Sequence, residues 1–316
     1  MKKTVLIDTD PGVDDALALL WALHCPLLEI KAITTVCGNV DVDTATANLG
    51  TVLDVVSGPC PVLAQGAKRP LVREPYFANH VHGANGLGGS RTGTDPASRL
   101  LALSKREAKD EIAHQALISS EPLTVVTLGP LTNIALALED CPELADRLTE
   151  IVMMGGAYLG PGNITPAAEF NIFTDPEAAD RVFRSKIPVT AVGLDVTRQV
   201  RLDRDTLDTW VQESNSSARQ KIREWTVHSL SYMQKLDGRA SIFLHDPLAV
   251  IATVAPGLIT TEPMHVEVET KGKLTQGMTL ADRRPILDIW KEAPNVRVCT
   301  QVDSNQSLKR FLQGIP

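Results

Sequence analysis

Residues 4–15 read TVLIDTDPGVDD, an apolar run that leads into a turn flanked by aspartates. The run is typical of a β-strand that stops at Asp8, Pro11-Gly12 force a turn, and a helix begins at Asp14-Asp15. The four aspartates of this stretch are thereby gathered at the C-terminal end of a strand, where open α/β sheets bind their ligands. Because like charges repel at such short range, a hard divalent cation with oxygen ligands is their natural partner.

A purely structural interpretation covers only part of this stretch. Asp14 and Asp15 are favoured in the first turn of a helix by the helix dipole alone, and Pro-Gly turns are common. Neither reason explains why Asp8 and Asp10 flank the same turn. The stretch therefore predicts a site for a metal or a polyol at this end of the sheet.

Composition and charge exclude several classes of protein. The chain has 316 residues, of which 43% are hydrophobic and 22% charged, and a net charge of −7. This acidic balance does not suit a protein that binds nucleic acid, and apolar stretches such as residues 16–23 are too short to cross a membrane. The five cysteines show no CxxC spacing, which argues against a disulfide framework or a zinc site. Because no signal-peptide pattern precedes the first strand, we expect a cytoplasmic protein.

Strands and helices alternate over the first two thirds of the chain. Continuous apolar strands such as Leu123–Leu128 suit a parallel sheet that is buried on both faces. We therefore expect an α/β fold with a doubly wound, mostly parallel central sheet. The expected strands are Thr4–Asp8, Ile30–Val36, Pro61–Ala64, Leu123–Leu128, Glu150–Met154 and Pro188–Leu194. The expected helices are Asp15–Leu23, Thr44–Val56, Lys105–Ile118, Leu131–Leu138 and Pro176–Phe183.

The last third of the chain follows a different pattern. An amphipathic stretch predicts a long helix over Ser217–Leu236, and a short apolar helix follows His245-Asp246-Pro247. Three later segments are typical of antiparallel additions at the edge of the sheet: Met264–Val268, Gly277–Leu280 and Asn295–Val302.

The turn-rich stretch from Asn79 to Ser98 has no periodicity and predicts a mobile loop. No linker divides the chain, so we expect a single domain over residues 1–316.

Polar residues follow several of the expected strands directly. Because the carboxyl ends of parallel strands meet at one edge of a sheet, we expect these side chains to lie close together. They are Asp10, Asp14, Asp15, Asn39, Asn163, Glu169, Asn171, His245 and Asp246.

Most of these residues also have a simpler explanation. Asn39 and Asn163 are common turn residues, and Asp246 before Pro247 is a good helix N-cap. His245 follows an apolar run and could be a buried, hydrogen-bonded histidine. All of these explanations must hold at once for the site to be absent, which favours the functional interpretation.

The opening motif and five later segments resemble, in order, the inosine-uridine preferring nucleoside hydrolase family. The resemblance covers residue 4 to about residue 255 and implies that family's fold. Its segments are DTDPGVDD at 8–15, TTVCGN at 34–39, LGPLTNIA at 128–135, MMGG at 153–156, AEFN at 168–171 and LHDP at 244–247.

The resemblance implies one Ca²⁺ per subunit. Its ligands would be Asp10, Asp15, the main-chain carbonyl of Leu128 and a carboxylate oxygen of Asp246. The 2′- and 3′-hydroxyls of the substrate and a water molecule would complete the coordination. Because Leu128 would contribute only its backbone, its apolar side chain does not conflict with this role.

The resemblance also assigns the residues around the substrate. Asp14, Asn39, Asn171 and Asp246 would hold the ribose diol. Met154 would pack against the sugar, and Asn163 and Glu169 would bind the 5′-hydroxyl. Asp10 would be the general base, and His245 would be the candidate acid towards the leaving base.

The implied reaction is hydrolysis of the N-glycosidic bond of ribonucleosides, which agrees with the chemistry of these residues. A cation lowers the pKa of bound water, and clustered carboxylates stabilise a sugar that becomes positively charged. Histidine, with an ordinary pKa near ~6.5, suits donation of a proton to the leaving base.

Base specificity has the weakest support in the sequence. The regions that would cover the base offer His80, His82, Asn85, Gln234 and Arg239, of which His82 lies in a loop that resembles the family's pattern. The sequence shows neither a pair of stacking aromatic residues nor a tyrosine close to His245, and Tyr232 is the nearest. We therefore expect an enzyme that acts on both purine and pyrimidine ribonucleosides.

Two other functions are also compatible with parts of the sequence. Asp8-Thr9-Asp10 also suits a haloacid-dehalogenase-type phosphatase with Asp8 as nucleophile, and a non-catalytic nucleoside-binding protein could share the fold. The phosphatase leaves the other polar residues without a role, and a binding protein would not need the complete catalytic set. We expect the chain to assemble as a homodimer or homotetramer, without nucleic-acid or membrane partners.

Overall fold

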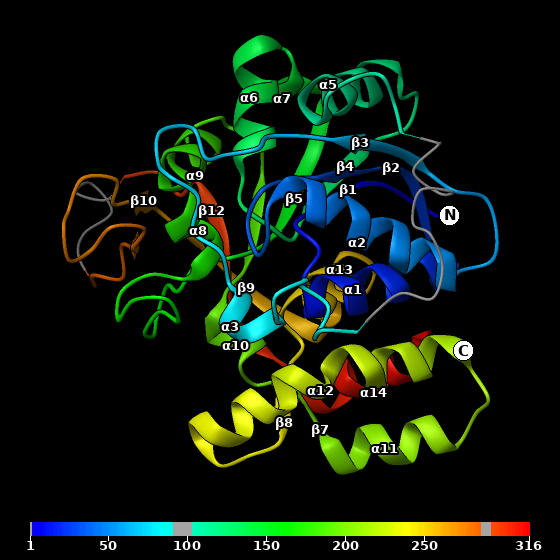
Figure 1. Cartoon of the computed structure of the whole chain (residues 1–316). Helices are drawn as coiled ribbons and strands as arrows, with labels where there is room; N and C mark the ends of the chain where they lie inside the picture. The colour runs from blue at the N-terminus through cyan, green and yellow to red at the C-terminus, as the bar shows by residue number, and fades with distance from the viewer. Residues whose placement is uncertain (1, 91–102, 286–291) are drawn as a thin grey trace.

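The computed structural model describes residues 2–90, 103–285 and 292–316. Its centre is an eight-stranded sheet in the order β3-β2-β1-β4-β5-β6-β12-β9 (Figure 1). All neighbouring strands in it are parallel except β9, which is antiparallel to β12. The strands are β1 (Lys3–Thr9), β2 (Leu28–Thr35), β3 (Val62–Gln65), β4 (Leu123–Thr127), β5 (Leu148–Met154), β6 (Val189–Val192), β9 (Ile259–Met264) and β12 (Val296–Val302).

Helices cover both faces of this sheet (Figure 1). One face carries α1 (Val13–His24), α2 (Val42–Val55), α13 (His245–Val254) and α14 (Ser304–Gly314). The other carries α5 (Ala108–Ile118), α6 (Thr132–Asp140), α7 (Leu144–Arg147) and α9 (Pro176–Phe183). The expectation of a doubly wound α/β fold is therefore confirmed.

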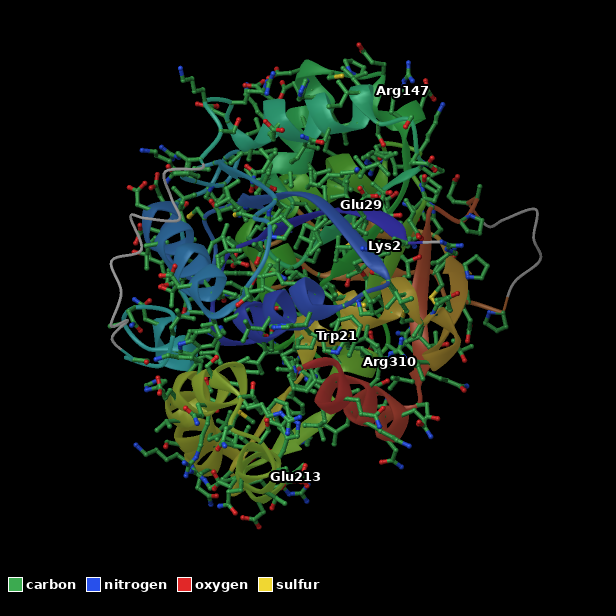
Figure 2. The ribbon with its side chains drawn as sticks, turned by 90° about the vertical axis from the view of Figure 1, so that its right-hand side faces the viewer. Lys2, Trp21, Glu29, Arg147, Glu213 and Arg310 are labelled. Carbon is green, nitrogen blue, oxygen red and sulfur yellow. The ribbon has the colours of Figure 1, made fainter. Side chains whose placement is uncertain are left out.

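The apolar run of β1 explains why the sheet needs helices on both sides. Val5 and Ile7 pack into the hydrophobic cluster on the α1 face, and Leu6 packs into the cluster on the opposite face. Successive side chains of a strand point to opposite faces, so an uninterrupted apolar strand must be covered twice. The indole N–H of Trp21 donates to the carbonyl of Arg310 at 3.1 Å and thereby attaches α14 to α1 (Figure 2).

Shorter elements complete the rim of the sheet. The long helix α12 (Ser217–Asp237) packs against α11 (Arg204–Gln212) and against β8 (Ser241–Phe243), which forms a separate two-stranded antiparallel sheet with β7 (Arg201–Asp203). The remaining elements are α3 (Asn79–His82), α8 (Phe170–Thr174), α10 (Leu194–Thr197), the 3₁₀ turn Pro256–Leu258, β10 (Val266–Val268) and β11 (Thr279–Ala281).

Two expectations about the edge of the sheet require correction. The segment Asn295–Val302 is not at the edge of the sheet, because β12 lies between β6, to which it is parallel, and the edge strand β9, to which it is antiparallel. The predicted strand Met264–Val268 is divided between β9 and β10, and β10 pairs with β11 in a separate two-stranded sheet. Local patterns indicate that a segment is extended but not which strand it joins.

The stretch 79–98 is only partly the loop expected from its composition. Its first residues form the short helix α3, and residues 91–98 lie outside the described residues. The expected helix Lys105–Ile118 begins later, at Ala108. Over the part of the chain that the structure describes, no helix combines the length and the apolar character that a membrane span needs.

Candidate functional site

The site lies where two neighbouring strands lead the chain in opposite directions. From β1 the chain moves outward to β2 and β3, and from β4 it moves outward to β5 and β6. The loops after β1 and β4 therefore diverge, which is where such sheets bind their ligands. A cavity of about 370 Å³ opens at this point. It is lined by ten of the residues predicted from the sequence: Asp14, Asn39, His82, Leu128, Met154, Asn163, Glu169, Asn171, His245 and Asp246.

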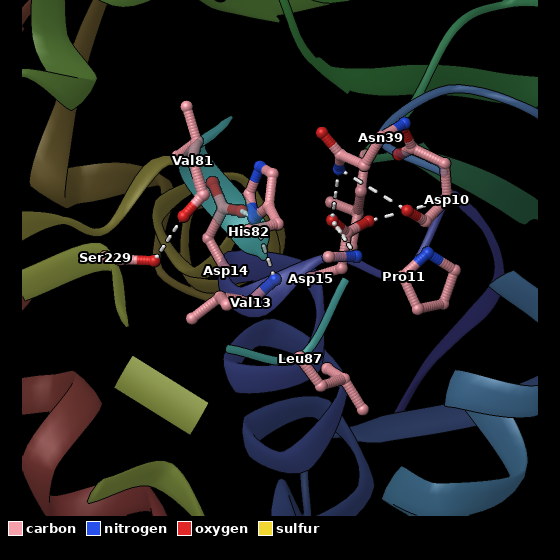
Figure 3. Close-up of polar contacts among 12 residues, drawn as sticks. Asp10, Pro11, Val13, Asp14, Asp15, Asn39, Val81, His82, Leu87 and Ser229 are labelled. Carbon is pink, nitrogen blue, oxygen red and sulfur yellow. Dashed lines mark hydrogen bonds and ion pairs between the residues drawn. The ribbon is translucent and has the colours of Figure 1, made fainter. Parts of the chain in front are cut away.

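Asp15 does not line the cavity, because it is completely buried and holds the turn in place. Its Oδ1 accepts the hydroxyl of Thr9 at 2.5 Å. Its Oδ2 accepts the backbone N–H of Gly12 and the side-chain N–H of Asn39, both at 3.0 Å (Figure 3). The first turn of α1 and the loop after β2 are thus joined through one carboxylate.

Asp10 is also completely buried and does not line the cavity. Its Oδ2 accepts the backbone N–H of Asn39 at 2.6 Å. Its Oδ1 is buried without a hydrogen-bond partner among the described residues. A buried carboxylate oxygen is costly unless a hydrogen bond or a cation compensates it, so this atom indicates a missing positive group.

Three carboxylates approach one another at the floor of the site. The oxygens of Asp14, Asp15 and Asp246 lie within 4.8 Å of one another. Asp246 is brought there by α13, which packs against α1. This closest set contains Asp14, whereas the resemblance implies Asp10 as the third ligand. Asp10 is nevertheless near enough for its charge to contribute to the raised pKa of Asp246.

The carboxylates are held in an environment that opposes their ionisation. Burial, and then the charge of Asp15, raises the pKa of Asp10 well above its ordinary value. Burial raises the pKa of Asp14 to about 6, and burial with the charge of Asp14 raises that of Asp246 well above its ordinary value. A cation among them would reverse these effects. The oxygen-only ligands and the unpartnered oxygen of Asp10 therefore fit a hard divalent cation such as Ca²⁺.

Asn171 joins the ends of β4 and β5 at the wall of the cavity. Its amide N–H donates to the carbonyl of Leu128 at 2.7 Å and to the carbonyl of Met154 at 3.1 Å. Leu128 lines the cavity, and its carbonyl oxygen, which accepts one hydrogen bond from Asn171, has a second lone pair for another ligand.

Glu169 and Asn163 form a second polar group, away from the carboxylate cluster. Glu169 is 2% exposed and caps α8, where its oxygens accept the backbone N–H groups of Asn171 at 2.9 Å and Ile172 at 3.2 Å. It also accepts the N–H of Gly156 at 2.9 Å. Asn163 accepts the N–H of Phe170 at 2.9 Å through its side-chain oxygen. These bonds fix both side chains before any ligand arrives.

His82 is fixed against the start of α1 (Figure 3). Its Nδ1 accepts the backbone N–H of Val13 at 3.0 Å and lies 3.8 Å from Oδ1 of Asp14. Burial lowers the pKa of His82 to about 4, so the ring is neutral near pH 7 with its proton on Nε2. His82 therefore closes the cavity beside the carboxylates.

His245 begins α13 and lines the cavity next to Asp246. Its Nδ1 lies 2.7 Å from Oγ1 of Thr197, and the centroid of its ring lies 5.3 Å from the centroid of the Phe243 ring. Burial, and then the charge of Arg198, lowers the pKa of His245 to about 3. The ring is thus neutral near pH 7 and can present a ring N–H to a ligand.

One face of α12, which lies in a region expected to cover the base, forms a wall of the cavity, but mostly through residues that the sequence did not single out. Ser229, Tyr232, Met233 and Leu236 recur at helical spacing and line the cavity together with Phe243. The sequence predicted this helix, but nothing in its amphipathic pattern indicates which element it faces. Tyr232, which appeared too far from His245 along the chain, shares the cavity with it.

The hydroxyl of Ser229 donates to the carbonyl of Val81 at 2.9 Å and attaches α3 to α12 (Figure 3). Of the other residues considered for base recognition, His80 lines the cavity, and its ring packs against that of Tyr232 with 5.8 Å between the ring centroids. The remaining three, Asn85, Gln234 and Arg239, do not line it.

Asp8 has no access to the cavity. It is completely buried, and its Oδ1 accepts the hydroxyl of Thr34 at 2.5 Å and the side-chain N–H of Asn133 at 2.8 Å. Unlike Asp10, it is also not among the carboxylates whose charges act on Asp246 at the floor of the cavity. The geometry therefore opposes the phosphatase hypothesis.

Comparison with protein families finds one model that matches nearly the whole chain. It describes the inosine-uridine preferring nucleoside hydrolase and matches residues 5–309. A non-specific ribonucleoside hydrolase, RihC, of Escherichia fergusonii is 39% identical over 100% of this chain and 97% of its own length. A pyrimidine-specific ribonucleoside hydrolase, RihA, of Salmonella schwarzengrund is 39% identical over 96% of this chain and 95% of its own length.

Solved structures show the same architecture. A plant nucleoside hydrolase superimposes with a TM-score of 0.89 at 33% identity, covering 100% of this chain and 99% of its own. A purine-preferring ribonucleoside hydrolase from Gardnerella vaginalis superimposes with a TM-score of 0.90 at 32% identity, covering 99% and 98%.

Proposed function

This chain belongs to the inosine-uridine preferring nucleoside hydrolase family and is a ribonucleoside hydrolase, and we propose that it works with Ca²⁺ and with Asp10 as general base. The observation that carries this proposal is the unpartnered buried oxygen of Asp10 beside the cluster of Asp14, Asp15 and Asp246. When bound, Ca²⁺ would supply the positive charge that holds a ribose diol and makes water easier to deprotonate. Asp10, Asp15, Asp246 and the Leu128 carbonyl would hold it.

Asp10 then accepts a proton from the water that attacks the anomeric carbon of the ribose. Its position is fixed by the N–H of Asn39, so little reorganisation is needed during the reaction. As the glycosidic bond breaks, the sugar gains positive charge, which the surrounding carboxylates stabilise. Asp14, Asn39 and Asn171 orient the ribose through its hydroxyls from the floor and the wall of the cavity.

Glu169 and Asn163 bind the 5′-hydroxyl of the ribose, and Met154 packs against the sugar. A negatively charged substituent at this place would lie against the buried Glu169 carboxylate, and two like charges so close repel each other. We therefore expect nucleoside 5′-phosphates to be poor substrates.

His245 assists departure of the base. A neutral imidazole donates a hydrogen bond from its N–H, and this bond becomes stronger as negative charge develops on the leaving base. His245 and Asp246 are neighbours in the first turn of α13. This turn can therefore direct Asp246 to the ribose and His245 to the base. His82, on the same side of the cavity, is a further contact for the base.

The base pocket is suited to both purines and pyrimidines. Its outer wall is formed largely by apolar side chains of α12 and by Phe243, and a hydrophobic wall discriminates weakly between ligands. The hydroxyl of Ser229, a polar group there, is engaged with Val81. Relatives of equal identity are named as non-specific and as pyrimidine-specific enzymes, so identity alone does not decide the breadth.

The test is release of ribose from inosine and uridine, with EDTA and after calcium is restored. We expect both substrates to be cleaved, EDTA to abolish cleavage and Ca²⁺ to restore it. Deoxyuridine should be slower by about 10²-fold or more in kcat/KM, because polar groups that bind the 2′-hydroxyl would remain unpaired. Release of phosphate from p-nitrophenyl phosphate without release of ribose would instead support the phosphatase, and binding without turnover a nucleoside-binding protein.

A second test isolates His245. His245→Ala should reduce kcat on inosine by about 10²–10⁴-fold, because the purine leaves poorly without a hydrogen-bond donor. It should leave p-nitrophenyl β-D-ribofuranoside almost unaffected, because this leaving group needs no such help. An equal loss on both substrates would show that His245 has only a packing role.

A further inference from the structure

Helix α10 contributes a residue to the site that no sequence motif singles out. Thr197, at the end of α10, is completely buried. Its Oγ1 lies 2.7 Å from Nδ1 of His245. α10 follows β6, whereas His245 begins α13, so this hydrogen bond joins two elements that are distant in the sequence.

Burial decides the direction of this hydrogen bond. Within the described part of the chain, Thr197 Oγ1 forms no other hydrogen bond. If Nδ1 carried the proton, the buried hydroxyl would only accept, and its own O–H would have no acceptor, which is unfavourable. If the hydroxyl donates to Nδ1 instead, both atoms are satisfied. Nδ1 is then unprotonated, and the ring proton of His245 is on Nε2.

Nε2 is the atom of His245 that a ligand can reach. His245 lines the cavity. Among the described residues, Nε2 has no hydrogen-bond partner, and it is not one of the fully buried polar atoms that lack a partner. It is therefore accessible from the cavity. Phe243 packs against the ring and limits its rotation. An N–H at this position is therefore available to a base, whereas the other tautomer would present only a lone pair.

We propose that Thr197 is a positioning residue that fixes His245 in its Nε2–H tautomer and directs that N–H at the departing base. This inference rests on the proposed function, in which His245 assists departure of the base. Thr197 does not line the cavity, so it acts only through His245.

The test compares Thr197→Val, which removes the hydroxyl at nearly constant volume, with Thr197→Ser, which keeps it. On inosine, Thr197→Val should lower kcat by about 10- to 100-fold with little change in KM, because the donor is no longer fixed in place. Thr197→Ser should restore kcat to near the wild-type value. Neither variant should alter cleavage of p-nitrophenyl β-D-ribofuranoside, which does not need the donor.

A double-mutant cycle separates positioning from general stability. In the His245→Ala background, Thr197→Val should cause no further loss on inosine. A further loss there, an equal loss on both substrates, or a Ser variant as poor as the Val variant would overturn the proposal. Failure of the proposed function is distinguishable, because His245→Ala would then lose the same activity on both substrates whatever stands at position 197.

A measurement on the unmodified enzyme reports the tautomer of His245 directly. Long-range ¹H–¹⁵N NMR spectra of ¹⁵N-labelled protein near pH 7 distinguish the two histidine tautomers, and the His245 signals are assigned by their loss in His245→Gln. We expect a protonated Nε2 and an unprotonated Nδ1. A protonated Nδ1 would overturn the proposal.

Discussion

Asp10 occupies a space that two glycines leave open. A Cβ atom at Gly38 would lie 2.0 Å from Oδ2 of Asp10, and one at Gly129 would lie 2.4 Å from Oδ1. Any side chain at either position would displace the carboxylate. The glycines that follow β2 and β4 thus allow the two loops to enclose Asp10, and they add to the single hydrogen bond from Asn39 in fixing its orientation.

Replacement of Asp10 by asparagine tests its role as a base with little change in shape. The side-chain oxygen of asparagine can still accept the N–H of Asn39, but an amide cannot take a proton from water. We expect Asp10→Asn to fold and to lose about 10²–10⁴-fold in kcat on inosine and uridine, measured by release of ribose.

Asp41→Asn is the matched control for this substitution. Asp41 caps α2 by accepting the N–H of Thr44 at 2.9 Å, and asparagine caps helices about as well as aspartate does. Activity should therefore be unchanged. A fully active Asp10→Asn enzyme would show that another group accepts the proton.

At the scale of single residues, the sequence indicated which side chains would meet but not how they would be arranged. The parallel strands brought Asp10 and Asn39 to one edge because parallel strands share a direction, whereas Asp246 reaches it through the packing of α13 against α1. The structure adds that Asp14 completes the closest set of carboxylates and that His82 and His245 are neutral. These properties depend on distances and burial that arise only from packing.

Among the secondary-structure elements, α10 organises more of the site than its length suggests. Asp195 accepts the backbone N–H groups of Tyr158, Leu159 and Gly160, each at 2.9 Å. Arg198 donates to the carbonyls of the next two residues, at 2.9 and 2.6 Å. The backbone from 158 to 162 is therefore held by one short helix, and this segment leads directly to Asn163.

Removal of the Asp195 carboxylate should weaken binding of the substrate. Asp195→Ala frees three N–H groups of the loop that leads to Asn163, so the position of Asn163 for the 5′-hydroxyl is held less firmly. We expect KM for inosine and uridine to rise by roughly 5- to 10-fold, equivalent to about one hydrogen bond, with a smaller effect on kcat. Steady-state kinetics on both substrates measure this change.

Asp203→Ala is the control for a lost helix cap. Asp203 caps α11 by accepting the N–H of Thr206 at 2.8 Å, and α11 does not line the cavity. This variant should lose about 1 kcal/mol of stability with an unchanged KM. If Asp195→Ala behaved in the same way, the loop would not depend on α10 for its position.

Elements with a clear pattern were predictable, and short ones were not. The buried parallel strands were identified because their apolar runs are continuous, as in β4. α10 has only four residues, too few for a helical period, so the predicted strand Pro188–Leu194 was extended into it. Similarly, nothing local in Asn295–Val302 indicates that its partner is β6, because that pairing depends on where the chain returns.

In the whole molecule, the proposed metal site exists only when distant segments are brought together. Asp10 and Asp15 follow β1, Leu128 follows β4, and Asp246 begins α13. An unfolded chain would not hold these ligands together, so binding of Ca²⁺ should stabilise the folded state. A calcium concentration of about 100 times the dissociation constant should add about 2.7 kcal/mol. The midpoint of thermal unfolding with Ca²⁺ and with EDTA measures this effect, and Asp246→Asn should abolish the difference.

The effect of Ca²⁺ should also depend on pH. Burial raises the pKa of Asp8 from 3.8 to about 7 and that of Asp14 from 3.8 to about 6, so these two carboxyls bind protons more tightly in the folded protein without metal than in the unfolded chain. Their contribution to stability should therefore fall as pH rises from about 4 to about 7, whereas the lowered pKa values of His82 and His245 act in the opposite direction with and without metal. A cation beside Asp14 removes that part of the penalty, so the difference in unfolding temperature between Ca²⁺ and EDTA should grow over the same range. A difference that shrinks as pH rises, or is absent at pH 7, would contradict a cation among these carboxylates.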